Sequence, residues 1–438
     1  MINFLRKITP RPLLLFYHKC WAILGNVIYR FPGRKIKVIG VTGTNGKTTT
    51  CNMIAKILTD AGKKVGLSST VNFQIGDKKW VNESKLTVLG RFGLPKILRQ
   101  MVDASCEFAV LEVSSHAITQ NRIWGIPFDA AVFTNLTHDH LDYHKDLKDY
   151  RNTKGRLFAN LSKSLKKDMP KILIVNADDP ESAYFASFNA NKKQAYTISD
   201  KDIGLPKISA KNIKIENFGS HFEVETPREK FNLNLKIPGK FNISNALAAY
   251  SLTEALGIKQ NIIKKSLEKF EGVPGRMEFI NEGQGFFVVV DYAHTPDALE
   301  KIYQTLKPQT SGKIISVLGA TGDRDKTKRP ILGELAGKYA DYVIVTDEDP
   351  YSENPESIMD QVIEGVVKTG KIEKKDFWKI LDREKAIKFA IKLASDNDCV
   401  IITGKGCERV MVTNQGKISW DDKQIVRQAL KKRKINGN

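Results

Sequence analysis

The sequence has few of the features that cross-link a chain or bind zinc. Its five cysteines stand far apart, at positions 20, 51, 106, 399 and 407, and form no CxxC pair. This spacing indicates neither a disulfide framework nor a zinc site. We therefore expect a protein of a reducing compartment, the cytoplasm. Internal repeats and low-complexity tracts are also absent from the sequence.

Long apolar runs are missing as well. The most apolar stretch, Pro12 to Tyr29, is interrupted by His18, Lys19 and Asn26. It is too short and too polar for a transmembrane span, and it lacks a small-residue cleavage site. Two interpretations stay open. The stretch is either a helix packed against its own domain, or a basic amphipathic helix through which residues 1–30 touch an anionic membrane surface.

Acidic residues are in the minority. The chain has 49 Asp and Glu residues against 69 Lys and Arg residues, which gives a formal net charge of +20. Such an excess favours polyanionic partners such as nucleotides, nucleic acid or an anionic membrane face. Clustered aromatic and basic residues that could stack bases are not present, so we expect no nucleic-acid partner.

The chain of 438 residues, 41% of them hydrophobic, is long enough for two or three domains. From Lys35 onward, apolar runs alternate with longer amphipathic stretches, which is typical of a parallel sheet covered by helices. We therefore predict an α/β protein with a mostly parallel central sheet and a C-terminal Rossmann-like α/β domain. The predicted divisions are a short N-terminal segment 1–36, a central domain 37–277 and a C-terminal domain 278–438.

The apolar runs also locate the strands. The predicted buried strands are 37–41, 108–113, 130–134 and 172–176 in the central domain, and 285–291, 313–318, 342–346 and 399–403 in the C-terminal domain. Between Lys207 and Leu235 apolar and polar residues alternate, which predicts a small antiparallel excursion before a helix that begins near Asn242.

A glycine-rich turn follows the first predicted strand, with the sequence GVTGTNGKTT from Gly40 to Thr49. Backbone N–H groups at such a strand-to-helix turn can point at phosphates, Lys47 can reach the terminal phosphates and Thr48 can hold Mg²⁺. The glycine spacing departs from the usual GxxxxGK[ST] pattern. The central domain is thus predicted to be a phosphate-loop ATPase domain, with these nucleotide contacts: Gly43, Thr44, Asn45, Gly46, Lys47, Thr48 and Thr49.

Carboxylate and imidazole side chains follow two later strands. Glu112 begins the segment EVSSH, and the segment FTNLTHDHLDYH spans residues 133–144, so that four of the seven histidines lie between positions 116 and 144. Both segments follow the carboxyl ends of predicted strands, which is the usual ligand-binding edge of an open α/β sheet. Together they indicate a site for a divalent cation.

These motifs resemble the Mur ligase family. The loop TGTNGKT, the segments EVSSH and FTNLTHDHLDYH, and Lys154 in YRNTKGRLF follow one another in the family order. The likeness is strongest to the branch that adds the third residue to UDP-N-acetylmuramoyl-dipeptide, and it runs from about Lys37 to the end of the second α/β unit. Family members usually carry a complete N-terminal domain that grips UDP. About 36 residues precede the first strand here, so the carrier group of the acceptor stays open.

The resemblance implies the cofactors and the catalytic residues. The nucleotide would be ATP, and Thr48 and Glu112 would hold one Mg²⁺. Glu112, His140 and a carbamylated Lys154 would hold or orient a second Mg²⁺, because the carbamate supplies an anionic oxygen that an ammonium group cannot. Lys47, Lys154 and His140 are the implied catalytic residues.

The resemblance also implies contacts to three further groups. The implied contacts to the muramoyl-peptide are Thr87, Ser114, Gln120 and Arg122. The implied contacts to adenosine and its phosphates are Asn245, Arg276, Asp291 and His294. The implied contacts to the incoming amino acid are Arg324, Asp349, Tyr351, Gly404 and Glu408.

One of these positions departs from its relatives. Family members that add meso-diaminopimelate place an arginine at the end of a DNPR-like motif, where it can grip the distal carboxylate bidentately. Tyr351 stands there in the segment DEDPY. Tyrosine offers a single hydroxyl hydrogen bond, so we expect a diamino acid without a distal carboxylate, such as lysine or ornithine. The alternative is that a neighbouring lysine or arginine takes over the contact.

The implied activity is an ATP-dependent ligase that joins an amino acid to a UDP-muramoyl-peptide through an acyl phosphate, in peptidoglycan synthesis, and we expect a monomer. Three alternatives remain. The first is another ligase of the same superfamily, related to folylpolyglutamate synthetase or linked to an amidotransferase. The second is a phosphate-loop ATPase without ligase activity. The third is a basic nucleic-acid-binding ATPase, which would bind with a steep salt dependence.

Overall fold

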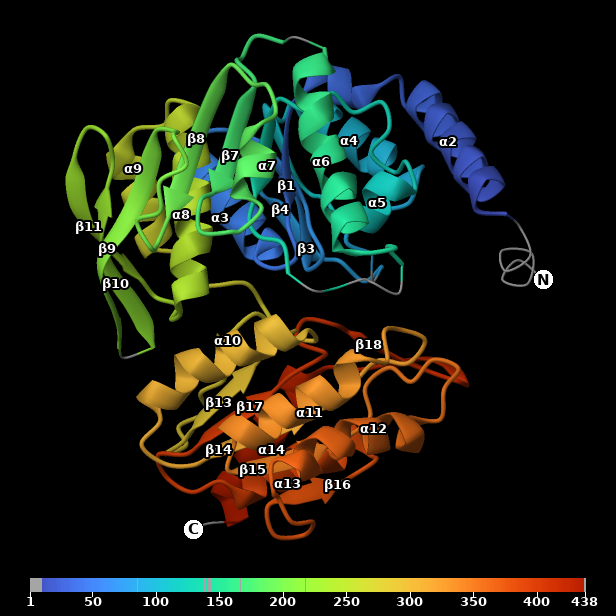
Figure 1. Cartoon of the computed structure of the whole chain (residues 1–438), viewed down its shortest axis with the longest axis vertical. Helices are drawn as coiled ribbons and strands as arrows, with labels where there is room; N and C mark the ends of the chain where they lie inside the picture. Colours follow the sequence, from blue (N-terminus) through green and yellow to red (C-terminus); the bar gives the residue numbers. More distant parts are fainter. Residues whose placement is uncertain are drawn as a thin grey trace.

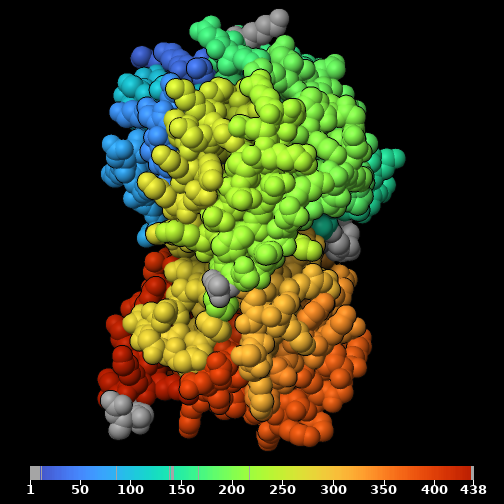
Figure 2. Space-filling model, turned by 90° about the vertical axis from the view of Figure 1, so that its left-hand side faces the viewer, coloured from blue at the N-terminus to red at the C-terminus, as the bar shows by residue number. Residues whose placement is uncertain are grey.

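The computed structural model describes residues 10–84, 86–137, 139, 143–165, 167–216 and 218–436. These residues form two lobes, each built around its own sheet (Figure 1). Figure 2 shows the lobe of the first sheet stacked on the lobe of the second. The predicted fold class, a central α/β domain followed by a second α/β domain, is therefore confirmed.

The first sheet has eleven strands within the described residues, in the order β11-β10-β9-β8-β7-β6-β1-β5-β2-β3-β4. Its middle is parallel and consists of β8 (Lys192–Thr197), β7 (Ile172–Asn176), β6 (Ala130–Phe133), β1 (Lys37–Thr42), β5 (Phe108–Glu112) and β2 (Val65–Ser68). The four strands predicted in this domain are confirmed. Their near-continuous apolar runs are what a strand covered on both faces requires.

Both edges of this sheet turn antiparallel. On one side β9 (Lys207–Glu216), β10 (Gly219–Glu225) and β11 (Lys230–Leu235) form the antiparallel excursion that the alternating pattern predicts. On the other side β3 (Asn72–Ile75) and β4 (Lys78–Val81) continue from β2 as a meander. This second edge was not predicted, because its strands are only four residues long and β4 includes two lysines.

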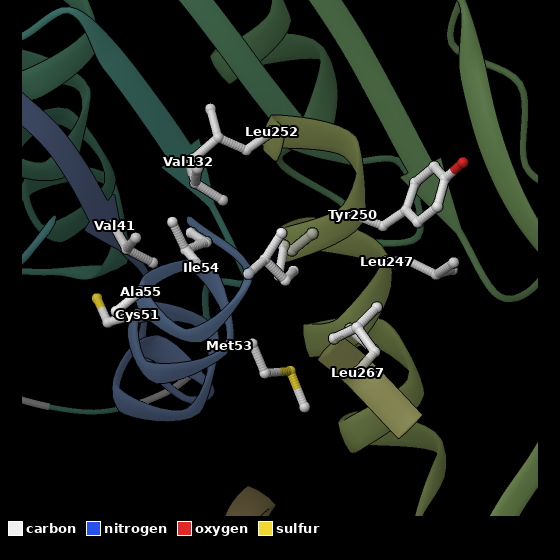
Figure 3. Packing of buried hydrophobic residues seen from close by; sticks show 14 of the residues in the cluster. Val41, Cys51, Met53, Ile54, Ala55, Val132, Leu247, Tyr250, Leu252 and Leu267 are labelled. Atoms are coloured by element: carbon white, nitrogen blue, oxygen red, sulfur yellow. The ribbon is translucent and has the colours of Figure 1, made fainter. Parts of the chain in front are cut away.

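Helices cover both faces of the first sheet. One face carries α3 (Lys47–Asp60), α8 (Lys240–Ala255) and α9 (Gln260–Glu268), whose apolar side chains, among them Ile54, Leu247 and Leu267, interlock with the sheet (Figure 3). The other face carries α4 (Gly93–Asp103), α5 (Ser115–Thr119), α6 (Leu147–Lys163) and α7 (Ser182–Ala186). The sheet is therefore held between two buried apolar layers, which fix the positions of the loops at its carboxyl edge.

The chain enters this domain through α2 (Arg11–Ile28) and the short helix η1 (Pro32–Lys35). Figure 1 shows α2 at the margin of the first domain, beside α4 and α5. Among the described residues, no helix is both long and apolar enough to cross a membrane.

The second sheet has the order β12-β13-β17-β14-β15-β16. Its strands are β12 (Glu278–Phe279), β13 (Phe287–Val290), β17 (Cys399–Ile402), β14 (Ile314–Leu318), β15 (Tyr342–Val345) and β16 (Phe377–Lys379), and all pairs except β12 with β13 are parallel. The four strands predicted here are confirmed. The helices on one face are α10 (Pro296–Leu306), α11 (Lys328–Tyr339) and α12 (Pro355–Lys368), and those on the other are α13 (Arg383–Leu393) and α14 (Asp422–Asn436).

Three small elements complete this domain. The short helix η2 (Lys307–Gln309) extends α10, and the hairpin of β18 (Val410–Thr413) and β19 (Gly416–Ser419) follows β17. The hairpin lies at the carboxyl edge of the second sheet, where it contacts the loop after β15 through its backbone. Loops at this edge are the usual place for a ligand in a doubly wound fold.

Candidate active site

The phosphate loop joins β1 to α3 at the carboxyl edge of the first sheet. Gly46 has a positive φ of 82°, and a Cβ there would collide with the side chain of Asn245. The backbone N–H of Thr44 donates to the carbonyl of Asn135 at 2.8 Å, and that of Asn45 donates to the Asn135 side chain at 2.8 Å. Glycine is thus needed where the loop turns under α8, and Asn135 holds the loop open at the start of the helix.

Thr48 and Glu112 meet beneath this loop. The Thr48 hydroxyl donates to Glu112 Oε2 at 2.9 Å, and both residues are buried. Thr70 adds two bonds to the same carboxylate, from its N–H at 2.8 Å and its hydroxyl at 2.9 Å, and its hydroxyl lies 3.1 Å from that of Thr87. A row of oxygen atoms therefore leads from the phosphate loop to Thr87. Thr49, one residue further along α3, is also buried.

Two buried lysines flank the loop. Lys47 Nζ donates to the carbonyl of Thr44 at 2.6 Å, and burial lowers the pKa of this lysine although the nearby Glu112 opposes the shift. Lys154, on α6, is only 1% exposed and donates to the carbonyl of Gly43 at 2.8 Å. Burial, reinforced by the charge of Lys47, holds the pKa of Lys154 well below its usual range. An amine with a lowered pKa spends more time neutral.

The oxygen atoms of Thr48, Thr70 and Glu112 fit the preference of Mg²⁺ for hard oxygen ligands. Groups of three or more His, Cys, Asp and Glu side chains arranged to hold a metal do not occur within the described part of the chain. His140, expected as a ligand and a catalytic residue, lies outside the described residues. The adjacent Asp139 is described and buried, and its charge raises the pKa of Lys154 and of His116 against the effect of burial.

The second domain contributes its own residues to the same edge. The Asn45 amide donates to Asp297 on α10 at 2.7 Å, which joins the phosphate loop directly to that domain. The guanidinium of Arg276 lies 4.4 Å from the ring centre of Tyr292, and its charge reaches Lys47, whose pKa it lowers further. Asp291 accepts from the N–H of Met277 at 2.6 Å.

Two further residues of the expected nucleotide set lie in this region. His294 donates from Nδ1 to the carbonyl of Tyr292, 2.9 Å away, and burial lowers the pKa of His294 to about 4. Its imidazole is therefore neutral at physiological pH. Asn245 on α8 accepts from the Thr50 hydroxyl at 3.3 Å beside Gly46. The structure thus brings the expected ATP contacts of both domains toward one loop.

The expected acceptor contacts divide into two groups. Arg122 donates to Gln120 Oε1 at 2.8 and 3.1 Å, and to the carbonyl of Val88 at 2.8 Å, so that this pair lies beside Thr87. Ser114 uses its hydroxyl to cap the N-terminus of α5, accepting from the N–H of Ala117 at 3.3 Å. Thr87, Gln120 and Arg122 therefore form one polar group, while the helix-capping role alone explains the Ser114 side chain in this structure.

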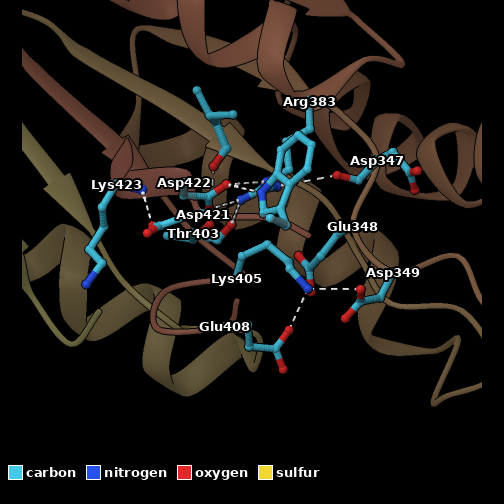
Figure 4. Close-up of polar contacts among 12 residues, drawn as sticks. Asp347, Glu348, Asp349, Arg383, Thr403, Lys405, Glu408, Asp421, Asp422 and Lys423 are labelled. Carbon is cyan, nitrogen blue, oxygen red and sulfur yellow. Dashed lines mark hydrogen bonds and ion pairs between the residues drawn. The ribbon is translucent and has the colours of Figure 1, made fainter. Parts of the chain in front are cut away.

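The expected amino-acid contacts surround a lysine that was not predicted. Lys405 is fully buried, and its ammonium donates to Asp349 Oδ1 at 2.9 Å, Glu408 Oε2 at 2.5 Å and the carbonyl of Val410 at 2.8 Å (Figure 4). Its three protons thus have three acceptors. Gly404 packs against the Glu348 carboxylate so closely that a Cβ would overlap with it. Lys405 therefore holds the two carboxylates at fixed positions.

Tyr351 and Arg324 lie on the open side of this group. The Arg324 guanidinium is 5.7 Å from the centre of the Tyr351 ring, and its side chain is exposed. Asp349 and Tyr351 both have a positive φ, of 43° and 51°. A left-handed backbone at two non-glycine residues costs about 1–3 kcal/mol each and is typical of ligand-binding loops.

Four residues of these sites could not be identified from the sequence, because no local pattern marks them. Thr70 and Asp139 lie in loops, and their type is common in loops. Lys405 stands in the segment GKGCE, residues 404–408, where a lysine suggests a surface residue. Arg383 forms a buried pair with Asp422 on α14 at 2.7 Å and donates to the carbonyl of Thr403 at 2.7 Å (Figure 4), a pairing across 39 residues. Only the fold reveals these partners.

The two domains match two family models. Residues 41–253 match the Mur ligase middle domain, and residues 275–406 match the Mur ligase glutamate ligase domain. With the phosphate loop and the buried carboxylate described above, these matches define the class: the chain belongs to the Mur ligase family. It is a peptide-forming ligase of a family that uses ATP and Mg²⁺.

Individual relatives narrow the likeness. UDP-N-acetylmuramoyl-L-alanyl-D-glutamate--2,6-diaminopimelate ligase of Geobacillus thermodenitrificans is 40% identical over 418 residues, covering 95% of this chain and 83% of that protein. UDP-N-acetylmuramyl-tripeptide synthetase of Roseiflexus sp. is 39% identical over 415 residues, covering 93% and 81%. Both similarities extend across the two domains. The names of both relatives belong to the branch of the family that the sequence motifs resemble.

Solved structures show the same fold. A structure of UDP-N-acetylmuramoyl-L-alanyl-D-glutamate--2,6-diaminopimelate ligase is 30% identical with a TM-score of 0.63, covering 95% of this chain and 83% of that one. Folylpolyglutamate synthase of Mycobacterium tuberculosis, with ADP and AMPPCP, has a TM-score of 0.69 at 16% identity, covering 88% and 92%. The second likeness extends to the fold alone.

Proposed function

We propose that this ligase adds a diamino acid to the free carboxylate of UDP-N-acetylmuramoyl-L-alanyl-D-glutamate at the expense of ATP. One observation carries the proposal: Lys47, the Thr48–Glu112 pair and Lys154 lie around one loop, and the polar row through Thr70 leads from it to Thr87. An acceptor carboxylate placed along this row would face the terminal phosphate of ATP. The relatives with this name at about 40% identity support the choice of acceptor.

The first step would be attack of the acceptor carboxylate on the γ-phosphorus of ATP, which forms an acyl phosphate and releases ADP. Lys47 would hold the terminal phosphate oxygens, and Thr48 and Glu112 would hold Mg²⁺. The metal, when bound, neutralises the repulsion between carboxylate and triphosphate. The neutral amine of the second substrate would then attack the acyl carbon and release phosphate. Asn45 and Asp297 would keep the second domain against the loop during both steps.

We also propose that Lys154 is carbamylated in the active enzyme. A neutral lysine amine adds CO₂ to give a carbamate and one proton, so burial that lowers the pKa of Lys154 favours the reaction. The product would place a negative oxygen near Glu112 and would relieve the repulsion between Lys154 and Lys47. Carbon-13 NMR of the protein under ¹³C-labelled CO₂ should show one carbamate signal that is absent from Lys154→Gln.

The incoming amino acid would lie between Arg324 and Glu408. Arg324 would bind its α-carboxylate, and Glu408 would accept from an amino group while Lys405 keeps the carboxylate in place. Tyr351 would face the far end of the side chain. We propose lysine or ornithine on this ground, whereas the names of the relatives favour diaminopimelate. Lys405 is already occupied by its own hydrogen bonds, so Arg324 is the cation beside Tyr351 among the described residues. Arg324 cannot bind the α-carboxylate and the distal carboxylate of diaminopimelate at the same time.

The test is a ligation assay with the purified protein. ATP, Mg²⁺, UDP-muramoyl-dipeptide and a mixture of amino acids are incubated, and the products are read by mass spectrometry. We expect one tripeptide product together with equimolar ADP and phosphate. Parallel reactions contain a folate acceptor, or omit the amino acids. A folate product, or ATP hydrolysis that is equally fast without any amino acid, would contradict the proposal.

A further inference from the structure

Helix α2 packs on its domain through its smallest and most polar face. Ala22, Gly25 and Asn26 are buried, and the Asn26 amide donates to the carbonyls of Trp124 at 2.8 Å and Ala22 at 3.0 Å. A Cβ on Gly25 would collide with the carbonyl of Arg91, so the helix lies directly against the backbone before α4. This is the reverse of a usual surface helix, which buries its large apolar side chains.

Most of the large apolar side chains of α2 are exposed instead, although the Trp21 ring also contacts that of Phe92, with 5.3 Å between the ring centres. The exposed large apolar residues of this helix are Leu13, Phe16, Tyr17, Trp21, Leu24, Val27 and Ile28. Their spacing of three and four residues places them along one side, and Phe16 is 65% and Ile28 54% exposed. A continuous apolar stripe facing water is unfavourable, and in soluble proteins it marks an interaction surface.

The helix and the segment that follows it carry charge of one sign, and the exposed carboxylate of Asp103 on α4 lies near Lys35. No Asp or Glu precedes Asp60 in the sequence. The exposed cations on α2 and just after it are Lys19, Arg30, Arg34 and Lys35. Arg34 also lines, together with Arg156 and Lys163, a hollow of about 410 Å³. A second copy of α2 would bring like charges together, whereas an anionic surface would be attracted.

We propose that α2 docks this ligase on an anionic lipid surface. Phe16, Tyr17 and Trp21 would lie at the level of the headgroups, where aromatic rings are preferred, and the cations at the end of the helix would contact lipid phosphates. The hollow beside Arg34 would take a phosphate-bearing headgroup. Since η1 precedes β1 and the phosphate loop follows it, docking leaves the catalytic edge of the sheet free.

The test uses the full chain and two kinds of vesicle, phosphatidylglycerol mixed with phosphatidylcholine and phosphatidylcholine alone. We expect sedimentation with the anionic vesicles, weakened by salt. Phe16→Ser with Ile28→Ser should lower the affinity at least about tenfold. The matched control, Val367→Ser with Ile372→Ser, changes two apolar side chains of 52% and 56% exposure on the other domain and should not change binding.

Two double charge-reversal variants distinguish specific docking from the effect of net charge. Lys19→Glu with Lys35→Glu should reduce binding about tenfold or more, whereas Lys431→Glu with Lys432→Glu, which alters the net charge equally, should reduce it much less. Quenching of Trp21 by brominated lipid, lost in Trp21→Phe, would place the helix in the bilayer interface.

Three outcomes would overturn the proposal. The first is absence of vesicle binding by the wild-type chain. The second is equal binding by the α2 variants and their controls. The third is concentration-dependent dimerisation, without vesicle binding, that the Phe16 and Ile28 substitutions abolish, because a second copy would then cover the stripe. None of the substituted residues lies in the ATP site, so unchanged ATP turnover of the variants without vesicles verifies that they are folded.

Discussion

Lys154 and Lys405 are both buried lysines beside an active-site loop, and they differ in what surrounds them. Lys154 donates to the backbone carbonyl of Gly43 and lies over the Tyr150 ring, 4.3 Å from its centre. Lys405 donates to two carboxylates and one carbonyl. The first lysine lacks an anion within hydrogen-bond distance in the described residues, whereas the second is fully neutralised.

This difference separates two uses of the same residue type. A buried ammonium without a close anion is costly, and burial accordingly lowers the pKa of Lys154, the direction that the proposed carbamylation requires. A buried ammonium between two carboxylates fixes their positions. In the described part of the chain, the lysine of the phosphate-loop site therefore lacks the close carboxylates that hold the lysine of the amino-acid site. The following predictions test this contrast, beginning with the largest expected effect.

Lys47→Ala should reduce ATP turnover by a factor of about 10²–10³, since one cation in a water-poor site contributes about 3–4 kcal/mol to a transition state with developing negative charge. No other lysine of the loop reaches the terminal phosphates. The measurement is phosphate release at saturating acceptor. A rate within tenfold of the wild type would remove Lys47 from the phosphate site.

Lys154→Ala should lower ligation about a hundredfold, and a short-chain carboxylate such as acetate should restore part of the activity by occupying the place of the carbamate. Lys47→Ala serves as the control, because a small acid cannot replace a cation there. Near-normal activity of the Lys154 variant, or equal response of both variants to acetate, would show that Lys154 is an ordinary structural lysine.

Lys405→Met should destabilise the C-terminal domain by about 3 kcal/mol, because Asp349 and Glu408 lose the ammonium group that lies between them. Carboxylate addition should not rescue this variant, in contrast to Lys154→Ala. Adding Glu408→Gln to Lys405→Met should recover part of the stability, since it removes one of the two negative charges that Lys405 neutralises in the wild type. Thermal unfolding gives the measurement. An unchanged melting temperature would indicate that water already screens the group.

The sequence alone predicts a site residue only where its contacts lie close to it in the chain. The phosphate loop and Glu112 were predictable, because each follows directly on a buried strand whose apolar run is unambiguous. The partners of Lys405 and Arg383 were not, because an ion pair across dozens of residues leaves no local pattern. The spacing of the apolar residues of α2 left two interpretations of this helix open, since it is the same whichever side these residues face.

The buried carboxyl group of Glu348 should make the stability of the C-terminal domain depend on pH. Burial raises the pKa of Glu348 to about 7 from 4.5. Its contribution to stability is therefore complete below about pH 4.5 and is lost as the pH rises through about 7, by about 3 kcal/mol. Glu348→Gln keeps the acceptor for Thr321 and should abolish this loss. Unfolding free energies of both proteins from pH 5 to 8 check it. Parallel pH profiles for wild type and variant would contradict the shifted pKa.

Tyr351→Arg should shift the choice of amino acid toward meso-diaminopimelate by about tenfold, because a guanidinium can bind the distal carboxylate bidentately. The effect stays at the lower end of the usual range for such a pair, since Tyr351 is only half-buried and water screens the new charge. Competition between lysine and diaminopimelate at equal concentration gives the ratio, and Tyr351→Phe should leave it unchanged.

If the wild-type enzyme already incorporates mainly diaminopimelate, as the names of its relatives favour, the inference from Tyr351 is wrong. Arg324, 5.7 Å from the Tyr351 ring, is then the cation to test, and Arg324→Lys should reduce diaminopimelate incorporation more than ATP binding.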